Sequence, residues 1–225
     1  MRFSDRSPDM LSFEIRAEPE TDCALCDRLV AFRKDNATAH PDWFNGAVPS
    51  FGLDTARLLI VGLAPGLKGA NRTGRPFWGD FAGHLLYPTL LKTGLARGEH
   101  DVLRPEALSL VDCMITNAVR CVPPQNKPTS GEIKRCRQFL DGRKAALPNL
   151  RAFLAIGRVA HDSLLSVFAV KKRDFPFAHG ARHLLPGGLE LFDTFHCSRL
   201  NTNTGRLTPE MFEQVVGDAA ASLRD

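Results

Sequence analysis

The sequence predicts a single α/β domain built on a mostly parallel sheet. Four short, strongly apolar stretches have the composition of buried strands, and helical patterns alternate with them along the chain. A chain of 225 residues is long enough for one substantial core, and it contains no repeat, low-complexity tract or long linker. We therefore expect one domain over residues 1–225.

Each expected strand is a continuous apolar run, which is the pattern of a strand covered on both faces. The first, RLLIVGLAP, ends in Gly and Pro, and the other three repeat this design. The expected strands occupy residues 57–65, 108–119, 150–157 and 189–196.

Segments with helical periodicity lie between the strands. In one of them Pro88 predicts a kink or a break, because proline lacks the N–H that a helix interior uses. The last segment opens with Thr208, which can cap a helix, and Pro209, which suits its first turn. The expected helices are residues 83–95, 130–147, 157–170 and 208–223.

Composition restricts the class of protein. The chain is 44% hydrophobic and 24% charged, as folded soluble proteins are, and no apolar run approaches the length of a membrane span. Near the start, Asp5, Asp9 and Glu14 stand where a signal peptide would need apolar residues. We therefore expect a cytoplasmic monomer with no membrane partner. The net charge of +4 gives weak support for a polyanionic partner.

Three polar loops follow expected strands at their carboxyl ends, where open α/β sheets bind ligands. They are rich in Gly, Pro, Asn, Thr and Arg, which serve special backbone geometry and hydrogen bonding better than they serve packing. The loops are residues 62–80, 116–124 and 196–206. We expect the functional site in a cleft between them.

Four cysteines form a second candidate site. Cys23 and Cys26 make a C-x2-C pair, and Cys121 and Cys136 bound a polar loop that has no strand-like stretch. In a reducing compartment disulfides are unfavoured, and four thiolates from two segments suit zinc or an iron–sulfur cluster. The spacing does not separate these metals, and four unrelated thiols are the alternative.

These motifs together resemble the uracil-DNA glycosylase superfamily, in particular its iron–sulfur branch, known as family 5 or type b. The resemblance runs from about Cys23 to Thr208 and rests on GLAPGLKGANRTGRPFWGD, TNAVRCVPP, KRCRQFL and HCSRLNTNTGRLT. It implies a three-layer α/β/α sandwich around a four-stranded, mostly parallel sheet. It also implies a [4Fe-4S] cluster, on Cys23, Cys26, Cys121 and Cys136.

The implied activity is that of a monofunctional DNA glycosylase in base-excision repair. Such an enzyme hydrolyses the N-glycosidic bond of uracil in DNA and leaves an abasic site. Family 5 members act on more than uracil, so hypoxanthine and other deaminated bases are candidate substrates. Two positions depart from related patterns: Leu63 stands where family 4 has an acidic residue, as is typical of family 5, and Cys197 replaces the usual proline of a His-Pro-Ser motif.

A glycosylase must extrude its nucleotide into a pocket, and the motifs supply candidates for the base end of that pocket. Phe77 would stack on the base, although a core aromatic is the structural alternative. Asn117 would read the base edge, since one amide offers both a donor and an acceptor. His196 would stabilise the negative charge that develops on the uracil O2.

Other candidates surround the base. Asp80 and Asn71 are the candidates for orienting water; a carboxylate can also act as a base, whereas an amide is a poor one. Backbone N–H groups from Ala64 to Gly66 would complete the pocket. Leu200 or Arg199 is the candidate wedge for the gap left by the extruded base. Phosphate contacts are expected from Lys68, Arg72, Arg75, Ser198, Arg199, Thr204 and Arg206.

Two other classes of function compete with this interpretation. The same four cysteines would suit a non-catalytic, zinc-stapled nucleic-acid-binding protein, which would be colourless where an iron–sulfur protein is brown. A nucleotide-processing α/β enzyme would use the Gly-rich first loop for phosphate. However, GLAPGLKGANRTG has neither the Lys-Ser/Thr end of a P-loop nor the G-x-G-x-x-G fingerprint.

Overall fold

A computed structural model describes residues 16–224 and contains a six-stranded sheet in the order β1-β5-β2-β6-β8-β7. Its four central strands are mutually parallel, which confirms the expected α/β class with a mostly parallel sheet. They are β5 (Cys113–Asn117), β2 (Leu58–Gly62), β6 (Ala152–Ile156) and β8 (Leu189–Thr194). All four lie inside the runs that the sequence indicates.

The expectation of four strands is wrong, because an antiparallel strand extends each edge of the sheet. β1 (Phe51–Gly52) pairs with β5, and β7 (Arg182–Leu185) pairs with β8. β1 has only two residues, and most of β7 is partly or fully exposed. Neither therefore carries the apolar run that marks a strand covered on both faces.

The expected strand 108–119 is two strands. β4 (Leu108–Leu110) pairs antiparallel with β3 (Ala96–Gly98) in a separate two-stranded sheet. Asp112 follows with φ 54°, in the left-handed region, and β5 starts at the next residue. The turn at Asp112 interrupts an apolar sequence that reads as continuous.

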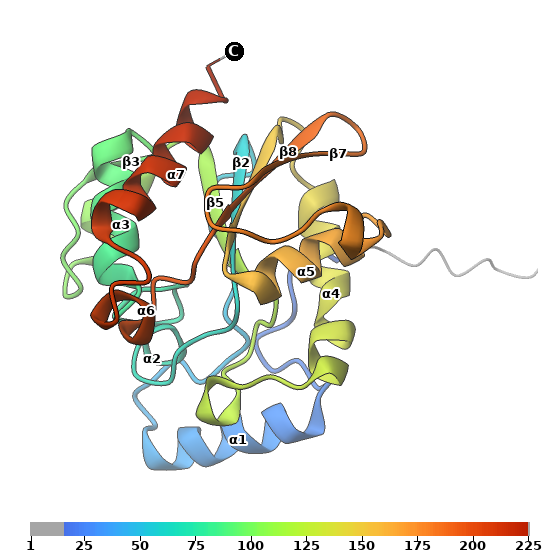
Figure 1. The fold of residues 1–225 in the computed structure, drawn as a ribbon. Helices are drawn as coiled ribbons and strands as arrows, with labels where there is room; N and C mark the ends of the chain where they lie inside the picture. The colour runs from blue at the N-terminus through green and yellow to red at the C-terminus, as the bar shows by residue number, and fades with distance from the viewer. Residues whose placement is uncertain (1–15, 225) are drawn as a thin grey trace, which may run out of the picture.

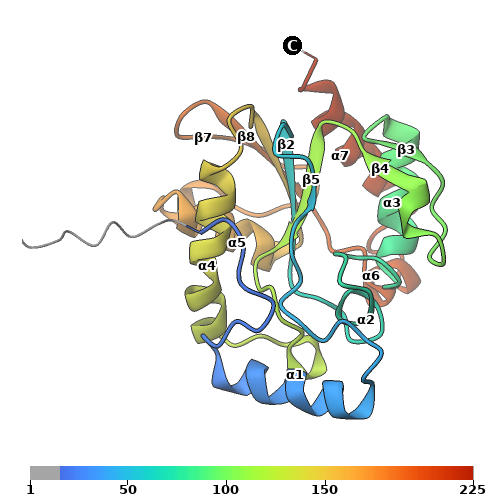
Figure 2. The same cartoon turned by 180° about the vertical axis from the view of Figure 1, so that it is seen from behind.

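Two pairs of helices cover the two faces of the sheet and make three layers (Figures 1 and 2). α3 (Gly83–Thr93) and α7 (Pro209–Ala221) share a core with Leu58 and Ile60 of β2. α4 (Ser130–Ala145) and α5 (Arg158–Val167) lie on the opposite face and share a core with Leu59 and Val61. Alternate residues of one strand thus enter different cores, which explains the unbroken apolar run.

The expected helices are present. Thr208 caps α7 through its side chain, and Pro209 is its first residue, as the sequence predicts. Of the expected kink or break at Pro88, the break is wrong: α3 runs through this proline, in its second turn. Within residues 16–224, no helix is both long enough and apolar enough to span a bilayer.

The carboxyl ends of the parallel strands carry helices of their own. α1 lies across this end of the molecule, with α2 and α6 beside it (Figure 1). The sequence pattern missed α1, whose buried residues include Arg33 and Asn36 and which therefore lacks a clear apolar stripe. The remaining elements are α1 (Asp27–Ala39), α2 (Ala70–Thr73), α6 (Arg199–Asn203) and the 3₁₀ turns Pro105–Ala107, Pro124–Asn126 and Lys172–Asp174.

Candidate active site and cysteine site

A pocket of about 520 Å³ opens at the carboxyl edge of the sheet, within the size range of small-molecule sites. One wall is the loop after β2, a second is the segment after β8, and a single residue comes from the chain between Cys121 and Cys136. The pocket lies where the strand ends predict it, but only two of the three expected loops line it: no residue of 116–124 does, and Asn126 lies just beyond that range. It is lined by Leu63, Ala64, Gly66, Phe77, Asp80, Phe81, Ala82, Asn126, His196, Ser198, Arg199 and Leu200.

The carboxylate of Asp80 is held against the loop that follows β2. The N–H of Ala70 donates to its Oδ2 at 3.2 Å, and a Cβ at Gly66 or Gly69 would collide with the carboxylate. Burial raises the pKa of Asp80 above its ordinary value, although the hydrogen bonds from Ala70 and Gly66 act in the opposite direction. A carboxylate with a raised pKa beside a pocket is a candidate base.

The base end of the site is formed where β2 and β5 terminate side by side. Gly62 lies in register with Asn117, and a Cβ at Gly62 would lie 2.5 Å from both Asn117 Oδ1 and the Phe77 ring. Phe77 is 6% exposed and has φ 60°, an unfavourable backbone conformation for an aromatic residue. The absence of a side chain at Gly62 therefore makes room for the amide and the ring to meet.

Asn117 does not line the open pocket but lies behind Phe77, and it is 3% exposed. Its Oδ1 is buried and has no hydrogen-bond partner among residues 16–224. An unpaired buried acceptor costs free energy in the folded protein, so it identifies a place where a ligand donor is accommodated.

His196 lies at the start of the segment that follows β8. Asn201 Nδ2 donates to its carbonyl oxygen at 2.8 Å, and Gly157, with φ 94°, leaves the room that the His196 side chain uses. The rings of His196 and Phe77 face each other at 29°, with centroids 6.5 Å apart. Burial lowers the pKa of His196, so the imidazole is neutral at pH 7.

The structure does not bring Asn71 to the pocket. Its Nδ2 donates to Asn45 Oδ1 at 2.9 Å, and its backbone oxygen accepts from the Asn45 N–H at 3.0 Å. Asn71 is fully buried and ties α2 to the loop that precedes β1. Of the two expected water-orienting residues, only Asp80 therefore has access to a substrate.

The expected phosphate-binding residues separate into three groups. Ser198 and Arg199 line the pocket, as does the expected wedge residue Leu200, which is 72% exposed. Arg75 instead packs inward, with its guanidinium 4.1 Å from the centroid of the Phe51 ring, and is only partly exposed. Outside the pocket, exposed on the surface, lie Lys68, Arg72, Thr204 and Arg206.

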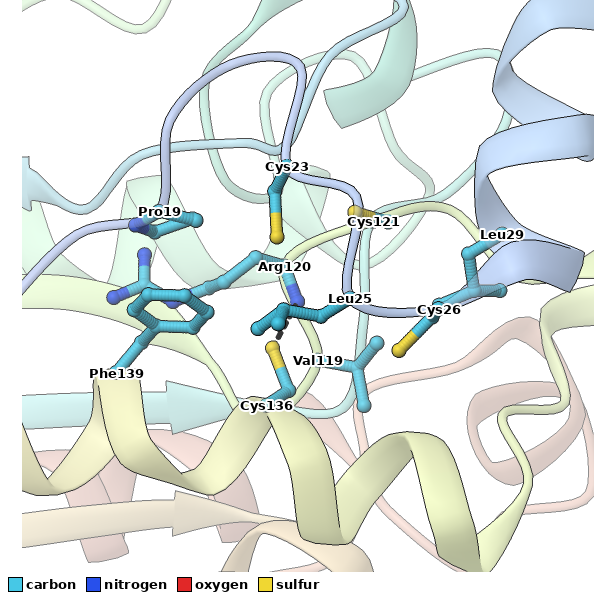
Figure 3. A pocket seen from close by; sticks show the side chains of 10 residues that line it. All are labelled: Pro19, Cys23, Leu25, Cys26, Leu29, Val119, Arg120, Cys121, Cys136 and Phe139. Atoms are coloured by element: carbon cyan, nitrogen blue, oxygen red, sulfur yellow. Dashed lines mark hydrogen bonds between the residues drawn. The ribbon is translucent and has the colours of Figure 1, made fainter.

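The four cysteines predicted to bind a metal group lie next to α1, around a small and mostly apolar cavity (Figure 3). Two come from the segment before α1, one follows β5 and one lies on α4. The N–H of Arg120 donates to Cys136 Sγ at 3.3 Å, and Leu25, Leu29, Val119 and Phe139 line the same cavity. The sequence prediction that Cys23, Cys26, Cys121 and Cys136 come together thus agrees with the fold.

The chemistry of this donor set fits a thiolate-bound metal group. Burial raises the pKa of Cys121 to about 12 and that of Cys136 to about 11. The guanidiniums of Arg33 and Arg120 act in the opposite direction on these two thiols. Deprotonation therefore requires a cation at the site, as metal binding supplies.

The family model of the uracil DNA glycosylase superfamily matches residues 49–220. The chain belongs to this superfamily. The match includes every residue that lines the pocket.

Type-5 members of the superfamily are similar over most of the chain. The type-5 uracil-DNA glycosylase of Thermus thermophilus is 45% identical over 205 residues, which are 88% of this chain and 93% of the relative. That of Mycobacterium leprae is 37% identical over 205 residues, 88% of this chain and 90% of the relative. A type-4 uracil-DNA glycosylase of Archaeoglobus fulgidus is 33% identical over 123 residues, 54% of this chain and 53% of the relative. The resemblance to family 5 is confirmed.

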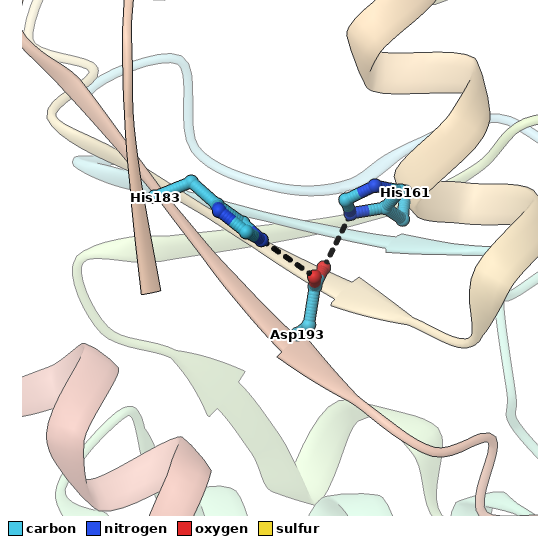
Figure 4. Close-up of side chains that lie close together, drawn as sticks. All are labelled: His161, His183 and Asp193. Carbon is cyan, nitrogen blue, oxygen red and sulfur yellow. Dashed lines mark hydrogen bonds and ion pairs between the residues drawn. The ribbon is translucent and has the colours of Figure 1, made fainter. Parts of the chain in front are cut away.

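A third polar cluster in this superfamily member lies within the sheet layers, away from the pocket (Figure 4). Nδ1 of His161 is 2.8 Å from Asp193 Oδ1, and its Nε2 is 2.9 Å from the carbonyl oxygen of Phe175. His183 Nε2 is 3.2 Å from Asp193 Oδ2. Both ring nitrogens of His161 thus lie within hydrogen-bond distance of oxygen atoms.

Sequence reasoning missed three residues that line the glycosylase-family pocket: Phe81, Ala82 and Asn126. Phe81, 40% exposed, lies under the guanidinium of Arg199 at 5.0 Å from its ring centroid. Asn126 reaches the pocket from the segment between Cys121 and Cys136. Phe81 directly follows a matching motif, but the only sequence signal for Asn126 is its position between proline-rich turns.

Proposed function

We propose that this protein is a monofunctional uracil-DNA glycosylase that extrudes uracil from DNA and hydrolyses its N-glycosidic bond. One observation carries the proposal: Phe77, Asp80 and His196 line one pocket at the carboxyl edge of the sheet. An aromatic surface, a carboxylate and a neutral imidazole are what base stacking, water activation and leaving-group stabilisation require. Family membership and the type-5 relatives support the same activity.

Base selection rests on Asn117. Its unpartnered Oδ1 accepts the N3–H of uracil, while its Nδ2 is available to donate to O4. Cytosine carries no proton on N3, so it would leave this buried acceptor unpaired and place two acceptors in opposition. The cost of an unpaired buried polar group, about 1–3 kcal/mol, disfavours cytosine.

Bond cleavage uses His196 and Asp80 on different parts of the nucleotide. As the C–N bond breaks, its electron pair moves into the base, and an N–H of neutral His196 donates to the developing charge on O2. Asp80 orients a water molecule toward C1′ and accepts a proton from it as the new C–O bond forms. With Leu63 apolar, Asp80 is the only carboxylate that lines the pocket among residues 16–224.

The rim of the pocket contacts DNA. Leu200 is the wedge that fills the space of the extruded base, since it is exposed and lies at the edge of the pocket. Arg199 and Ser198 bind phosphate beside it, with support from Lys68, Arg72 and Arg206 on the surrounding surface. Arg75 and Asn71 have structural roles instead, and cytoplasmic location and a monomeric state stay predictions.

The four cysteines hold a [4Fe-4S] cluster, which serves to anchor the chain between Cys121 and Cys136. The resemblance to the iron–sulfur branch of the superfamily favours a four-iron cluster over a single zinc ion. The N–H of Arg120 that reaches Cys136 Sγ suits a cluster thiolate.

A lesion panel tests the activity. Duplexes that each carry one uracil, hypoxanthine, xanthine or ethenocytosine are incubated with the protein and then cleaved with alkali at abasic sites. We expect strand cleavage at uracil and none in an undamaged duplex, and the remaining lanes define the range. Duplex binding without release of any base would favour the non-catalytic nucleic-acid-binding alternative.

Metal analysis of protein purified without air tests the cluster. We expect close to four iron and four sulfide per chain and absorbance near 400 nm; stoichiometric zinc instead would overturn the assignment. Cys136→Ser should lose the cluster and weaken DNA binding. Cys113→Ser is the matched control, because Cys113 is buried in the core with its thiol directed to the carbonyl of Leu95.

A further inference from the structure

One segment connects the cysteine site to the pocket. Residues 122–129, here called the inter-cysteine loop, run from Cys121 to the start of α4, and Asn126 is the one residue of this loop that lines the pocket. Asn126 is exposed, whereas Phe77 and Asn117 at the base end are buried. Asn126 therefore belongs to the mouth of the pocket.

The backbone at Asn126 has a conformation that most residues avoid. Gln125 and Asn126 both have φ 56°, two consecutive non-glycine residues in the left-handed region. Asparagine tolerates this region better than other side chains do, and backbone strain of this kind concentrates at functional sites. The N–H of Asn126 donates to the Pro123 carbonyl and that of Lys127 to the Pro124 carbonyl, each at 3.1 Å.

A separate brace holds the far end of the inter-cysteine loop. Arg28 on α1 donates to the carbonyl of Lys127 at 3.1 Å and to both carboxylate oxygens of Glu132, at 2.8 and 2.7 Å. Glu132 also forms a capping box with Thr129 at the start of α4. The loop is thus fixed by its backbone, by a cap and by an ion pair.

The amide of Asn126 is the part of this loop left for a ligand. Over residues 16–224 the side-chain amide of Asn126 has no hydrogen-bond partner, although the N–H groups of Asn126 and Lys127 are both bonded to backbone carbonyls. A rigid backbone that presents a side chain with a free donor and a free acceptor is an organised binding group.

We propose that Asn126 hydrogen-bonds the sugar–phosphate of the extruded nucleotide and so holds it at the mouth of the pocket. This inference rests on the proposed function. With the base directed toward Phe77 and Asn117, the deoxyribose and its phosphate lie at the exposed mouth, between Asn126 and the wall that carries Ser198. Asn126 is a neutral side chain, so it releases no counterions and adds nothing to the salt-dependent attraction for duplex DNA. Because it lines the pocket, it contacts the nucleotide once that nucleotide is extruded.

Binding and single-turnover cleavage of the full protein test this contact with two glycine variants. Asn126→Gly removes the amide and keeps the positive φ accessible; Gln125→Gly gives the same backbone freedom at the neighbouring residue, which does not line the pocket. Each is measured on an undamaged duplex, on a duplex with a tetrahydrofuran abasic-site analogue, and on a uracil duplex.

For Asn126→Gly we expect affinity for the analogue duplex to fall roughly 3–10-fold, the worth of one neutral hydrogen bond, with undamaged-duplex affinity and its salt dependence unchanged. Gln125→Gly should match wild type. Equal affinities for wild type and Asn126→Gly on the analogue, or an equal loss in Gln125→Gly, would overturn the inference. Wild-type protein that releases no uracil would overturn the proposed function and the inference with it; normal uracil release by Asn126→Gly with unchanged analogue binding overturns the inference alone.

Discussion

The end of β8 carries two arrangements of histidine and aspartate that differ in how fully their polar atoms are paired. At Asp193, within the strand, the carboxylate meets His161 and His183, and His161 has an oxygen at each ring nitrogen. Three residues after Asp193, His196 lies in a pocket with Asp80. Burial raises the pKa of Asp80 and lowers the pKa of His196. The same two residue types thus occupy a saturated cluster and an unsaturated one.

This difference in hydrogen-bond pairing indicates which cluster takes part in chemistry. A buried polar group with all its partners in place is stabilised and has no capacity left for a substrate. At the base end of the site, Asn117 Oδ1 lacks a partner among residues 16–224 and Phe77 holds a positive φ, so the fold keeps unfavourable features there. Unfavourable features persist where function requires them.

The largest expected effect is on stability, at the saturated cluster. Asp193→Asn removes the charge that pairs with His161 and should lower the free energy of unfolding by roughly 3–5 kcal/mol. Chemical denaturation measures this loss of unfolding free energy, and the m-value should be unchanged. The folded variant should keep the wild-type single-turnover rate, and a rate loss without destabilisation would contradict the structural role. Asp218→Asn on the surface of α7 is the control.

At the unsaturated cluster the expectation is reversed. His196→Ala removes the donor to the leaving uracil, so the single-turnover rate should fall about 10²–10³-fold, or roughly 2.7–4 kcal/mol. Duplex affinity should stay near its original value, because His196 is not at the phosphate-binding rim. A wild-type rate at saturating enzyme would make His196 a loop anchor, and weaker binding with a lower salt slope would make it a phosphate contact.

The two clusters also differ in what the sequence reveals. The pocket was predictable because its residues follow buried strands in short, Gly- and Pro-rich loops. The saturated cluster joins α5, β7 and β8, and none of its residues stands in a local pattern. Sequence likewise left both Asn71 and Asp80 as candidates for orienting water; only the contact between Asn71 and Asn45 removes the former.

The same limit applies to the fold. The four central strands were predictable from apolar runs that both cores require. β1 and β7 were missed, because an edge strand needs neither length nor a continuous apolar run. Arg75 looked like a phosphate contact beside the Gly-rich loop, yet it packs on Phe51, and no periodicity indicates this.

A pH profile of the single-turnover rate tests whether Asp80 is the base. The base must be ionised, and burial raises the pKa of Asp80, so the single-turnover rate should fall by about tenfold per pH unit below that raised value. The acid limb should therefore lie above the ordinary range for aspartate, near 3.9. Asp80→Asn should abolish the limb and leave a low, flat rate; persistence of the limb would assign it to another group.

The stability of Asp80→Asn gives an independent readout with a defined sign. Because the folded-state pKa is raised, the folded protein binds the proton more tightly than the unfolded chain, and stability falls as pH rises through the folded pKa. Asp80→Asn removes this loss, so the variant should be at least as stable as wild type at pH 7. Thermal unfolding at pH 7 checks it, and a clear destabilisation would contradict the desolvated state of the carboxylate.

The smallest effect concerns Phe77, which could belong to either side of the comparison, as a substrate-stacking ring or as a core aromatic. If it stacks on the extruded base, Phe77→Ala should weaken productive binding of a uracil duplex by about 1–3 kcal/mol. The loss should vanish on an abasic-site analogue, which offers no base to stack on. Phe168→Ala is the control, since Phe168 packs on Phe153 against the core on the α4–α5 side of the sheet and does not line the pocket. Equal affinities of Phe77→Ala and wild type for the uracil duplex, together with a lower unfolding free energy, would place Phe77 with the core.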